Sequence, residues 1–177
     1  MMCPSVPFTL RNQTMTADDD AIAAVHRAAF PGNDEARLVA ALVSDGDMRV
    51  SLVAEAAGGI IGHVMFSAMA VLADGVPVAA AGLAPVAVVP NRQRDGIGSA
   101  LIRAGLEALA AQAVSIVFVL GDPRYYRRFG FDAGIAARFA SPYAGPYLMA
   151  RWLSDARLIG QGSAAYSPAF ARMGATA

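Results

Sequence analysis

Hydrophobic residues in the first quarter of the chain recur three or four positions apart, the spacing of one helix face. The first stripe consists of Ile22, Val25, Ala29 and Phe30. Thr16 with Asp19 predicts a capping box that opens this helix, and the Pro-Gly-Asn run at 31–33 predicts its end. A second helix is predicted at Asp34–Ser44, with apolar residues along one face.

From residue 50 the pattern changes to β-type runs that are separated by short turns. Strands are predicted at residues 50–56, 60–72, 76–81 and 83–89. Gly58-Gly59 and Asp74-Gly75 provide the tight turns of two hairpins. The last run is nearly continuous in apolar residues, which is typical of a strand buried on both faces. These runs predict an antiparallel meander that ends in a central strand.

A long amphipathic helix is predicted at residues 96–112, because its apolar residues repeat with a period of 3.6. A short strand follows at residues 115–120. A strand–helix–strand unit of this length implies that residues 83–89 and 115–120 pair in parallel. The other predicted elements are a strand at 9–11, a helix near 123–129 that ends at Gly130, and strands at 147–153 and 164–166.

The composition indicates one globular domain spanning residues 1–177. Hydrophobic residues make up 56% of the chain and charged residues 16%, which is enough apolar material for a sizeable core. The formal net charge is zero, so nothing suggests nucleic acid or an anionic membrane as a partner. We expect no signal peptide, because residues 1–11 lack a basic stretch followed by an apolar core. We expect no membrane span, because no stretch of about 18 apolar residues is free of turn or charged residues.

The residue types that are missing exclude several chemistries. All 14 basic residues are Arg, so neither a lysine Schiff base nor a Walker P-loop is available. Cys3 is the only cysteine, which excludes an internal disulfide and fits a reducing, cytoplasmic location. One cysteine and two widely spaced histidines make no metal ligand set, so no metal is expected.

One segment between a predicted strand and a predicted helix carries a phosphate-binding pattern. It reads Q-x-x-G-x-G from Gln93 to Gly98. A helix N-terminus leaves unpaired N–H groups and carries partial positive charge, and glycines let the backbone approach a phosphate closely. Residues 157–162 fit a similar pattern but lack this context. A dinucleotide fingerprint is excluded, because it needs a small residue where Leu101 stands.

These residues resemble the GNAT superfamily of N-acetyltransferases over residues 83–113. A second match is residues 117–131, which end in Tyr-Tyr-Arg-Arg-Phe-Gly-Phe. Ser-Leu-Val-Ala-Glu at 51–55, Gly-His-Val-Met-Phe-Ser at 62–67 and Leu-Gly-Asp-Pro at 120–123 resemble the YhbS-like subgroup. The resemblance covers about residues 10–170. It implies an α/β fold with a mixed, mostly antiparallel central sheet flanked by helices.

The resemblance also implies an activity and roles for matched residues. The chain would move an acetyl group from acetyl-CoA, its co-substrate, directly to a primary amine in a ternary complex. Tyr126 would protonate the departing thiolate, and Tyr125 is the alternative. Main-chain groups of Val86, Ala87 and Val88 would hold the acetyl and pantetheine arm. The pyrophosphate would lie against Arg94, Asp95, Gly96, Ile97, Gly98 and Ser99.

The sequence departs from the family pattern at the general base. Many members carry a carboxylate on the fourth strand, whereas residues 83–85 are apolar here. The remaining candidates for the base are Glu35, Glu55, His63 and Asp122. His26 is predicted to lie on the surface, and Arg124, Arg127 and Arg128 to form either a solvated helix face or an anion-binding one.

Several alternatives stay open at this stage. A non-catalytic acyl-CoA-binding module is the alternative function, and an acyl donor longer than acetyl is a third. The acceptor, whether a small metabolite, an antibiotic, a peptide N-terminus or a protein side chain, is not determined by the sequence. The choice between a monomer and a homodimer is also open.

Overall fold

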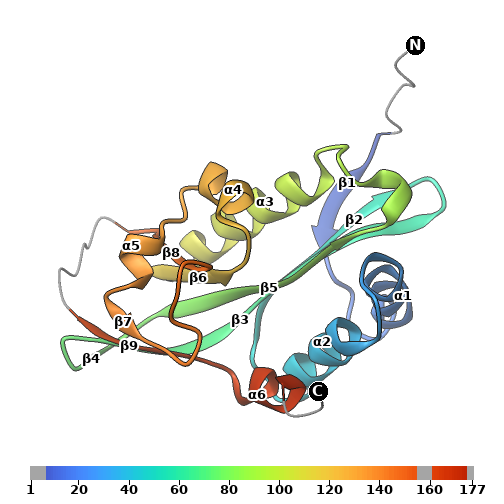
Figure 1. Ribbon diagram of the computed structural model, residues 1–177. Coiled ribbons are helices and arrows are strands. Elements are labelled where there is room, and N and C mark those ends of the chain that lie inside the picture. The colour runs from blue at the N-terminus through green and yellow to red at the C-terminus, as the bar shows by residue number, and fades with distance from the viewer. Residues whose placement is uncertain (1–6, 155–160, 175–177) are drawn as a thin grey trace.

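The computed structural model describes residues 7–154 and 161–174. Cys3 and most of the second glycine pattern, residues 157–160, lie outside these residues. One twisted sheet runs through the molecule, with helices on both of its faces (Figure 1). Within the described residues no helix is long and apolar enough to cross a membrane.

The sheet has the strand order β1-β2-β3-β5-β6-β8, with β4, β7 and β9 joined at one end through β3 and β9. β5 pairs in parallel with β6 and antiparallel with β3, as the sequence predicts. The expected mixed, mostly antiparallel sheet is thus confirmed. The strands are β1 (Thr9–Asn12), β2 (Met48–Ala56), β3 (Gly59–Ala73), β4 (Val76–Val78), β5 (Ala80–Val88), β6 (Ile116–Leu120), β7 (Phe139–Ala140), β8 (Leu148–Trp152) and β9 (Gly162–Tyr166).

Helices cover both faces of this sheet. α3 contacts β2, β3 and β5 on one face, whereas α1 packs against β3 and β5 and also contacts α2. In Figure 1, α1, α2 and α6 lie together, away from α3 and α4. The helices are α1 (Asp19–Ala29), α2 (Asp34–Ser44), α3 (Ile97–Ala111), α4 (Pro123–Tyr126), α5 (Ala133–Ala136) and α6 (Pro168–Gly174), with short 3-10 turns η1 (Pro90–Arg92) and η2 (Arg127–Phe129).

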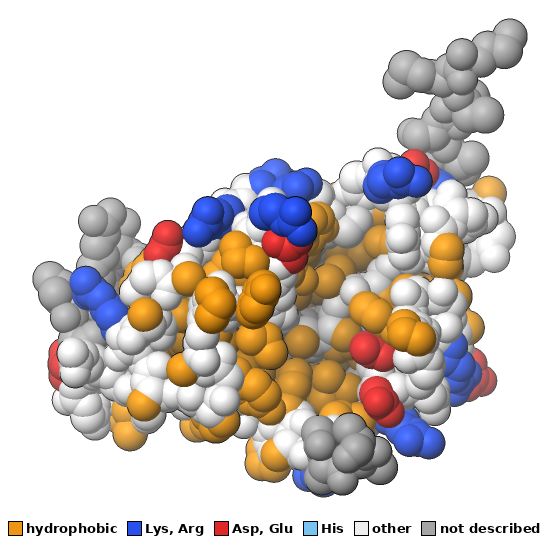
Figure 2. Space-filling model, in the orientation of Figure 1, with side chains coloured by type: hydrophobic (Ala, Val, Ile, Leu, Met, Phe, Trp, Pro, Cys, Tyr) orange, Lys and Arg blue, Asp and Glu red, His pale blue; other side chains and the backbone are white. Residues whose placement is uncertain are grey.

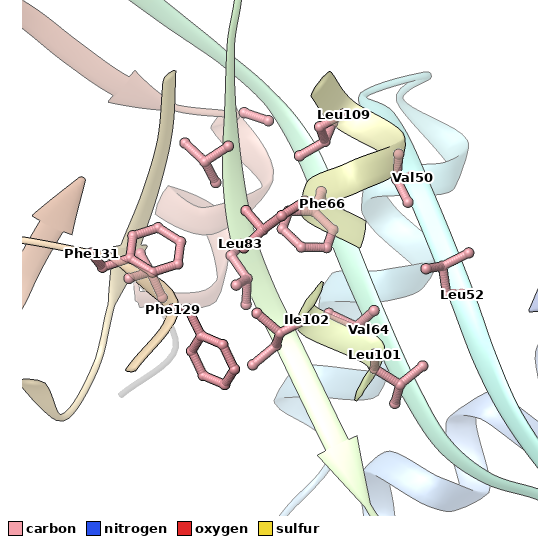
Figure 3. Close-up of a cluster of buried hydrophobic side chains, with 14 of the residues drawn as sticks. Val50, Leu52, Val64, Phe66, Leu83, Leu101, Ile102, Leu109, Phe129 and Phe131 are labelled. Atoms are coloured by element: carbon pink, nitrogen blue, oxygen red, sulfur yellow. The ribbon is translucent and has the colours of Figure 1, made fainter. Parts of the chain in front are cut away.

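Side chains of β2 and β3 alternate between two buried clusters, which follows from the two-residue repeat of a strand. Leu52, Val64 and Phe66 face the cluster under α3, which Figure 3 shows together with Leu101 and Phe129. The intervening residues face a second cluster beneath α1 and α2, which contains Val53, Met65, Ile22, Leu38, Val39 and Leu42. Because both faces are covered, the middle strands read as nearly continuous apolar runs.

The predicted capping box at Thr16 and Asp19 is wrong. The helix begins at Asp19, its N-cap residue is Asp18, and no side chain caps it. The Asp18 carboxylate instead accepts hydrogen bonds from Arg11 at 2.6 and 3.0 Å and from the Thr14 amide at 2.7 Å. A hydrogen bond between a guanidinium and a carboxylate is stronger than one from a neutral backbone amide. The Asp18 carboxylate therefore binds Arg11 and does not cap the helix.

The predicted strand boundary at Gly82 is also wrong. The break falls at Ala79, and Gly82 lies inside β5. A Cβ on Gly82 would lie 2.5 Å from the Tyr166 ring. This glycine therefore allows the Tyr166 ring to pack closely against β5 and does not form a turn. The hydrophobic pattern did not predict α5, β7 or α6, which are short elements with little periodicity.

Gly105 on α3 provides a test of how tightly α3 packs on the sheet. A Cβ at this position would lie 2.1 Å from the buried Phe66 ring. Gly105→Ala gains about 1 kcal/mol of helix propensity but overpacks the core at a cost of about 1–3 kcal/mol. We expect a net loss of up to about 2 kcal/mol in urea unfolding. Phe66→Leu in the same chain makes room, so the double variant should lose less than the two single losses combined.

Candidate active site

The site begins where β5 and β6 separate. Their parallel pairing runs from Ala80 opposite Ile116 to Leu83 opposite Val119 and stops there. β5 continues to Val88 alongside β3, after a register shift between Leu83 and Val86. Such bulges redirect a strand and often lie beside active sites. Within the described chain, the other edge of residues 86–88 is therefore not paired with any strand.

The loop after β5 presents the N-terminus of α3 to the same space. The Gln93 side-chain amide donates to the Val88 carbonyl at 3.0 Å, and Arg92 pairs with Asp95 at 2.9 Å. Arg94 and Gly96 both have positive φ, 69° and 82°. Gly96 is the N-cap residue of α3 and has no side chain that could occupy the amides of the first turn. These amides and the helix dipole form an anion-binding cradle.

A cleft of about 590 Å³ joins the free strand edge to this cradle, within the usual range of ligand pockets. Figure 2 shows a hollow floored by hydrophobic side chains between the part that carries α4 and α5 and the part that carries α1 and α2. Of the predicted coenzyme-binding residues, those that line the cleft are Val86, Ala87, Val88, Arg94, Gly96, Gly98 and Ser99. Asp95 and Ile97 do not line it; Ile97 is buried in the core.

The cleft carries positive charge next to apolar walls. Arg92, Arg94 and Arg128 line it, and the Arg128 guanidinium lies 4.7 Å from the centre of the Tyr125 ring. The ion pair with Asp95 neutralises one of these charges locally. Planar guanidinium groups suit phosphate oxygens. Arg124 does not line the cleft, because it folds back onto the Asp122 carboxylate.

The two adjacent tyrosines occupy different surroundings. Tyr125 lines the cleft, and a Cβ on Gly98 would lie 3.1 Å from the Tyr125 hydroxyl oxygen. Tyr126 is not among the residues that line it. Its ring packs against Gly121, at the end of β6, and lies edge-on to Phe131. Tyr126 therefore lies next to the point where β5 and β6 separate.

The Tyr126 hydroxyl keeps its proton at neutral pH. Burial, followed by the nearby Tyr125 phenol, raises the pKa of Tyr126 to about 12. The raised pKa makes this phenol a weaker acid, but it leaves the proton in place, where a departing anion could take it.

None of the four predicted base candidates lines the cleft. Glu55 pairs with Arg11 at 2.7 Å, and Arg124 binds Asp122, which lowers the pKa of that carboxyl. His63 is fully buried and both of its ring nitrogens have partners. Glu35 is half-buried in the first turn of α2.

The prediction that His26 lies on the surface is wrong, because the side chain is only 1% exposed. His26 Nε2 lies 2.8 Å from His63 Nδ1, and its ring stacks on Phe30. Charged neighbours in the sequence suggested exposure, but on a helix they point to other faces. The i, i+4 spacing from Ile22 was the signal that places His26 beside the buried stripe.

Among the described residues no three His, Cys, Asp or Glu side chains come together as a metal site. The polar groups that line the cleft come from main-chain amides, three arginines, the Tyr125 phenol, Gln93 and Ser99. This combination defines a class of protein: a mixed-sheet enzyme with a split between two parallel strands and an anion cradle at the following helix.

Comparison with known proteins agrees with this class. Residues 10–134 match the acetyltransferase (GNAT) domain, so the chain belongs to the GNAT family of acetyltransferases. The resemblance to GNAT acetyltransferases is thereby confirmed.

Its relatives include bacterial members of the same family. The chain is 36% identical to the uncharacterized N-acetyltransferase YjhQ of Escherichia coli K12, over 75% of each chain. The structure is similar to that of the GNAT family N-acetyltransferase YhbS from Escherichia coli in complex with CoA, with a TM-score of 0.85, 30% identity and coverage of 97% and 96%. A GNAT family acetyltransferase from Brucella melitensis in complex with acetyl-CoA has a TM-score of 0.75, 34% identity and coverage of 93% and 98%.

Proposed function

We propose that this protein transfers an acetyl group from acetyl-CoA to a primary amine, directly and within a ternary complex. The observation that carries the proposal is the continuity of the cleft. The free edge of β5 leads into the amide cradle of α3, and arginines lie beside it. An extended pantetheine arm suits a strand edge, and a pyrophosphate suits a helix N-terminus.

The space around the glycines of the loop shows whether a diphosphate can approach the backbone amides of this cradle. Gly96 has φ of 82° and open space around its Cα, and Gly98 lies against the Tyr125 hydroxyl. The backbone is therefore exposed at the position where a phosphate must approach closely. The lining residues that would hold the coenzyme are Val86, Ala87, Val88, Arg94, Gly96, Gly98 and Ser99. Asp95 and Ile97 do not line the cleft and would contribute only through the main chain of the same loop and helix start. The coenzyme supplies the reactive thioester, and the protein supplies orientation and proton transfer.

In the proposed reaction, strand amides of β5 hold the thioester carbonyl in position for attack by the amine. The amine nitrogen forms a bond to the carbonyl carbon, and the carbon–sulfur bond then breaks. Tyr126 gives its proton to the sulfur as the thiolate leaves. Tyr125 is assigned to the coenzyme, because it lines the cleft beside Gly98.

Calorimetry with coenzyme A and a thiol-release assay test this function. We expect binding of coenzyme A and release of free thiol from acetyl-CoA with at least one acceptor. The panel contains a polyamine, an aminoglycoside, a peptide with a free amino terminus, and a peptide whose only amine is a lysine. Absence of coenzyme A binding would refute the proposal.

The alternative function is a non-catalytic acyl-CoA-binding module. The observation that favours it is the apolar stretch Leu83, Ala84 and Pro85, where many family members carry a carboxylate. It predicts coenzyme A binding without thiol release across the whole panel. Competition between acyl-CoA chain lengths decides whether a longer acyl group is preferred.

A further inference from the structure

The three arginines that line the cleft differ in what holds them. Arg92 pairs with the Asp95 carboxylate at 2.9 Å. Within the described part of the chain, Arg94 and Arg128 form no ion pair with a carboxylate. Basic side chains lie on both sides of one end of the hollow in Figure 2. The cleft therefore keeps the positive charges of Arg94 and Arg128 uncompensated beside the amide cradle of α3.

Arg128, in η2, is held by an aromatic ring and not by a carboxylate. Its guanidinium carbon lies 4.7 Å from the centre of the Tyr125 ring, which is a cation–π contact. A carboxylate partner would occupy N–H groups of the guanidinium, whereas the face of a ring leaves them available. Arg128 is thus a positioned cation whose hydrogen-bond donors can turn to a ligand in the cleft.

The Tyr125 ring also sets where Arg128 lies relative to the cradle. The Tyr125 hydroxyl lies against the first turn of α3, since a Cβ on Gly98 would be 3.1 Å from its oxygen. Arg128 therefore lies one aromatic ring away from the cradle. Arg94, by contrast, belongs to the cradle loop itself, two residues before the N-cap residue Gly96. A ligand with one anionic group in the cradle can place a second anionic group at Arg128.

Coenzyme A has two anionic groups of this kind. One is the diphosphate that joins the pantetheine arm to the nucleoside, and the other is the 3′-phosphate on the ribose. The amides of α3 and the Arg94 side chain suit the diphosphate. The 3′-phosphate is a phosphomonoester, which is close to doubly charged at neutral pH and suits a guanidinium that has no other anionic partner.

We propose that Arg128 binds the 3′-phosphate of coenzyme A, with Tyr125 as its positioning residue, and that this contact makes the site prefer acetyl-CoA to 3′-dephospho-acetyl-CoA. The inference rests on the proposed function and extends it, because it assigns a second phosphate contact that determines which form of the coenzyme is used. Arg128 would contribute to binding and specificity, and not to the transfer step.

Calorimetry with coenzyme A and with 3′-dephospho-coenzyme A tests the proposal. We expect the wild type to bind coenzyme A about tenfold or more tightly than the dephospho form, the usual size of a hydrogen-bonded contact between charged groups. Arg128→Leu should weaken coenzyme A binding until the preference is less than about twofold. The same substitution should leave the Kd of the dephospho form within about twofold of the wild-type value, because that ligand lacks the group that Arg128 contacts.

Two neighbouring arginines provide matched controls. Arg94→Leu should weaken the binding of both ligands by a similar factor and keep the preference, because both ligands carry the diphosphate. Arg127 is exposed and does not line the cleft. Arg127→Leu removes the same charge from the neighbouring position and should leave both Kd values unchanged.

Two substitutions at Tyr125 test its positioning role. Tyr125→Phe keeps a ring face under the guanidinium, so the preference for coenzyme A should persist even where overall affinity falls. Tyr125→Leu removes the ring and should reduce the preference about threefold or more. Because the preference is a ratio of two Kd values for the same variant, a general loss of packing would lower both affinities without changing it.

Three results would overturn the inference. They are equal binding of the two ligands by the wild type, an undiminished preference in folded Arg128→Leu, and an equal loss for both ligands in that variant, which would place Arg128 at the diphosphate. Failure of the proposed function is recognised separately. A wild type that binds coenzyme A with the expected preference but releases no thiol would retain this inference and lose the transferase activity.

Discussion

Replacing Tyr126 by phenylalanine should lower kcat by a factor of 100 or more and leave coenzyme A affinity nearly intact. The substitution removes only the hydroxyl, so the ring still packs on Gly121 and beside Phe131. Without the phenol the thiolate must leave unprotonated or take its proton from water. A positioned acid typically contributes 10²–10⁴-fold. Steady-state thiol release and calorimetry measure the two quantities.

Tyr125→Phe is the matched control for this prediction. Tyr125 lines the cleft beside Gly98 and beneath Arg128, where the coenzyme is proposed to lie. We expect weaker coenzyme A binding with kcat changed by less than threefold. An unchanged kcat in Tyr126→Phe together with a large loss in Tyr125→Phe would exchange the roles of the two residues.

Lowering the pH from about 6.5 to about 4 should destabilise the protein by about 3 kcal/mol through His26 alone, with a further loss through His63. Burial lowers the pKa of His26 from 6.5 to about 4. Burial and the nearby His26 lower the pKa of His63 to about 3. Each unit of difference between the folded and unfolded states corresponds to about 1.4 kcal/mol.

The sign follows from proton binding. Between pH 6.5 and 4 the unfolded chain protonates its histidines while the folded chain does not, so acid favours unfolding. Above pH 6.5 the histidines are neutral in both the folded and the unfolded state, so they no longer destabilise the fold. The depressed pKa of Asp18, which results mainly from Arg11, acts at lower pH, below the ordinary aspartate value of 3.8. Urea unfolding at several pH values separates the two windows.

A double variant, His26→Gln with His63→Gln, is the control for the pH effect. It removes both titrating rings and keeps polar side chains at both buried positions. We expect lower stability at pH 7 but a nearly flat dependence between pH 6.5 and 4. The same slope as the wild type would show that other groups cause the acid sensitivity.

The main elements were predictable where a strong period or a turn enforced them. α2 begins and ends as predicted, because a clean apolar stripe lies between Asn33 and Asp45. The hairpin of β2 and β3 follows from Gly58 and Gly59, both of which have positive φ. Weakly periodic segments such as α5 and α6 were not predicted, because short helices depend on tertiary packing and not on local propensity.

The site was only partly predictable. The loop from Gln93 to Ser99 lies at the cleft as the motif indicates, since a strand end followed by a helix start fixes it locally. The different surroundings of Tyr125 and Tyr126 were not predictable, because adjacent residues on a short helix point in different directions. Their packing against Gly98 and Gly121 involves contacts across more than one element.

The sequence by itself determined the family, the order of the main elements and the anion cradle, because these depend on neighbouring residues along the chain. Only the tertiary structure decided that β5 separates from β6 and that Asp18 serves Arg11 instead of capping a helix. It alone also brought His26 and His63, 37 positions apart, within 2.8 Å of each other. The physical reason is that hydrogen bonds and burial depend on distance in space, which periodicity and local propensity do not encode.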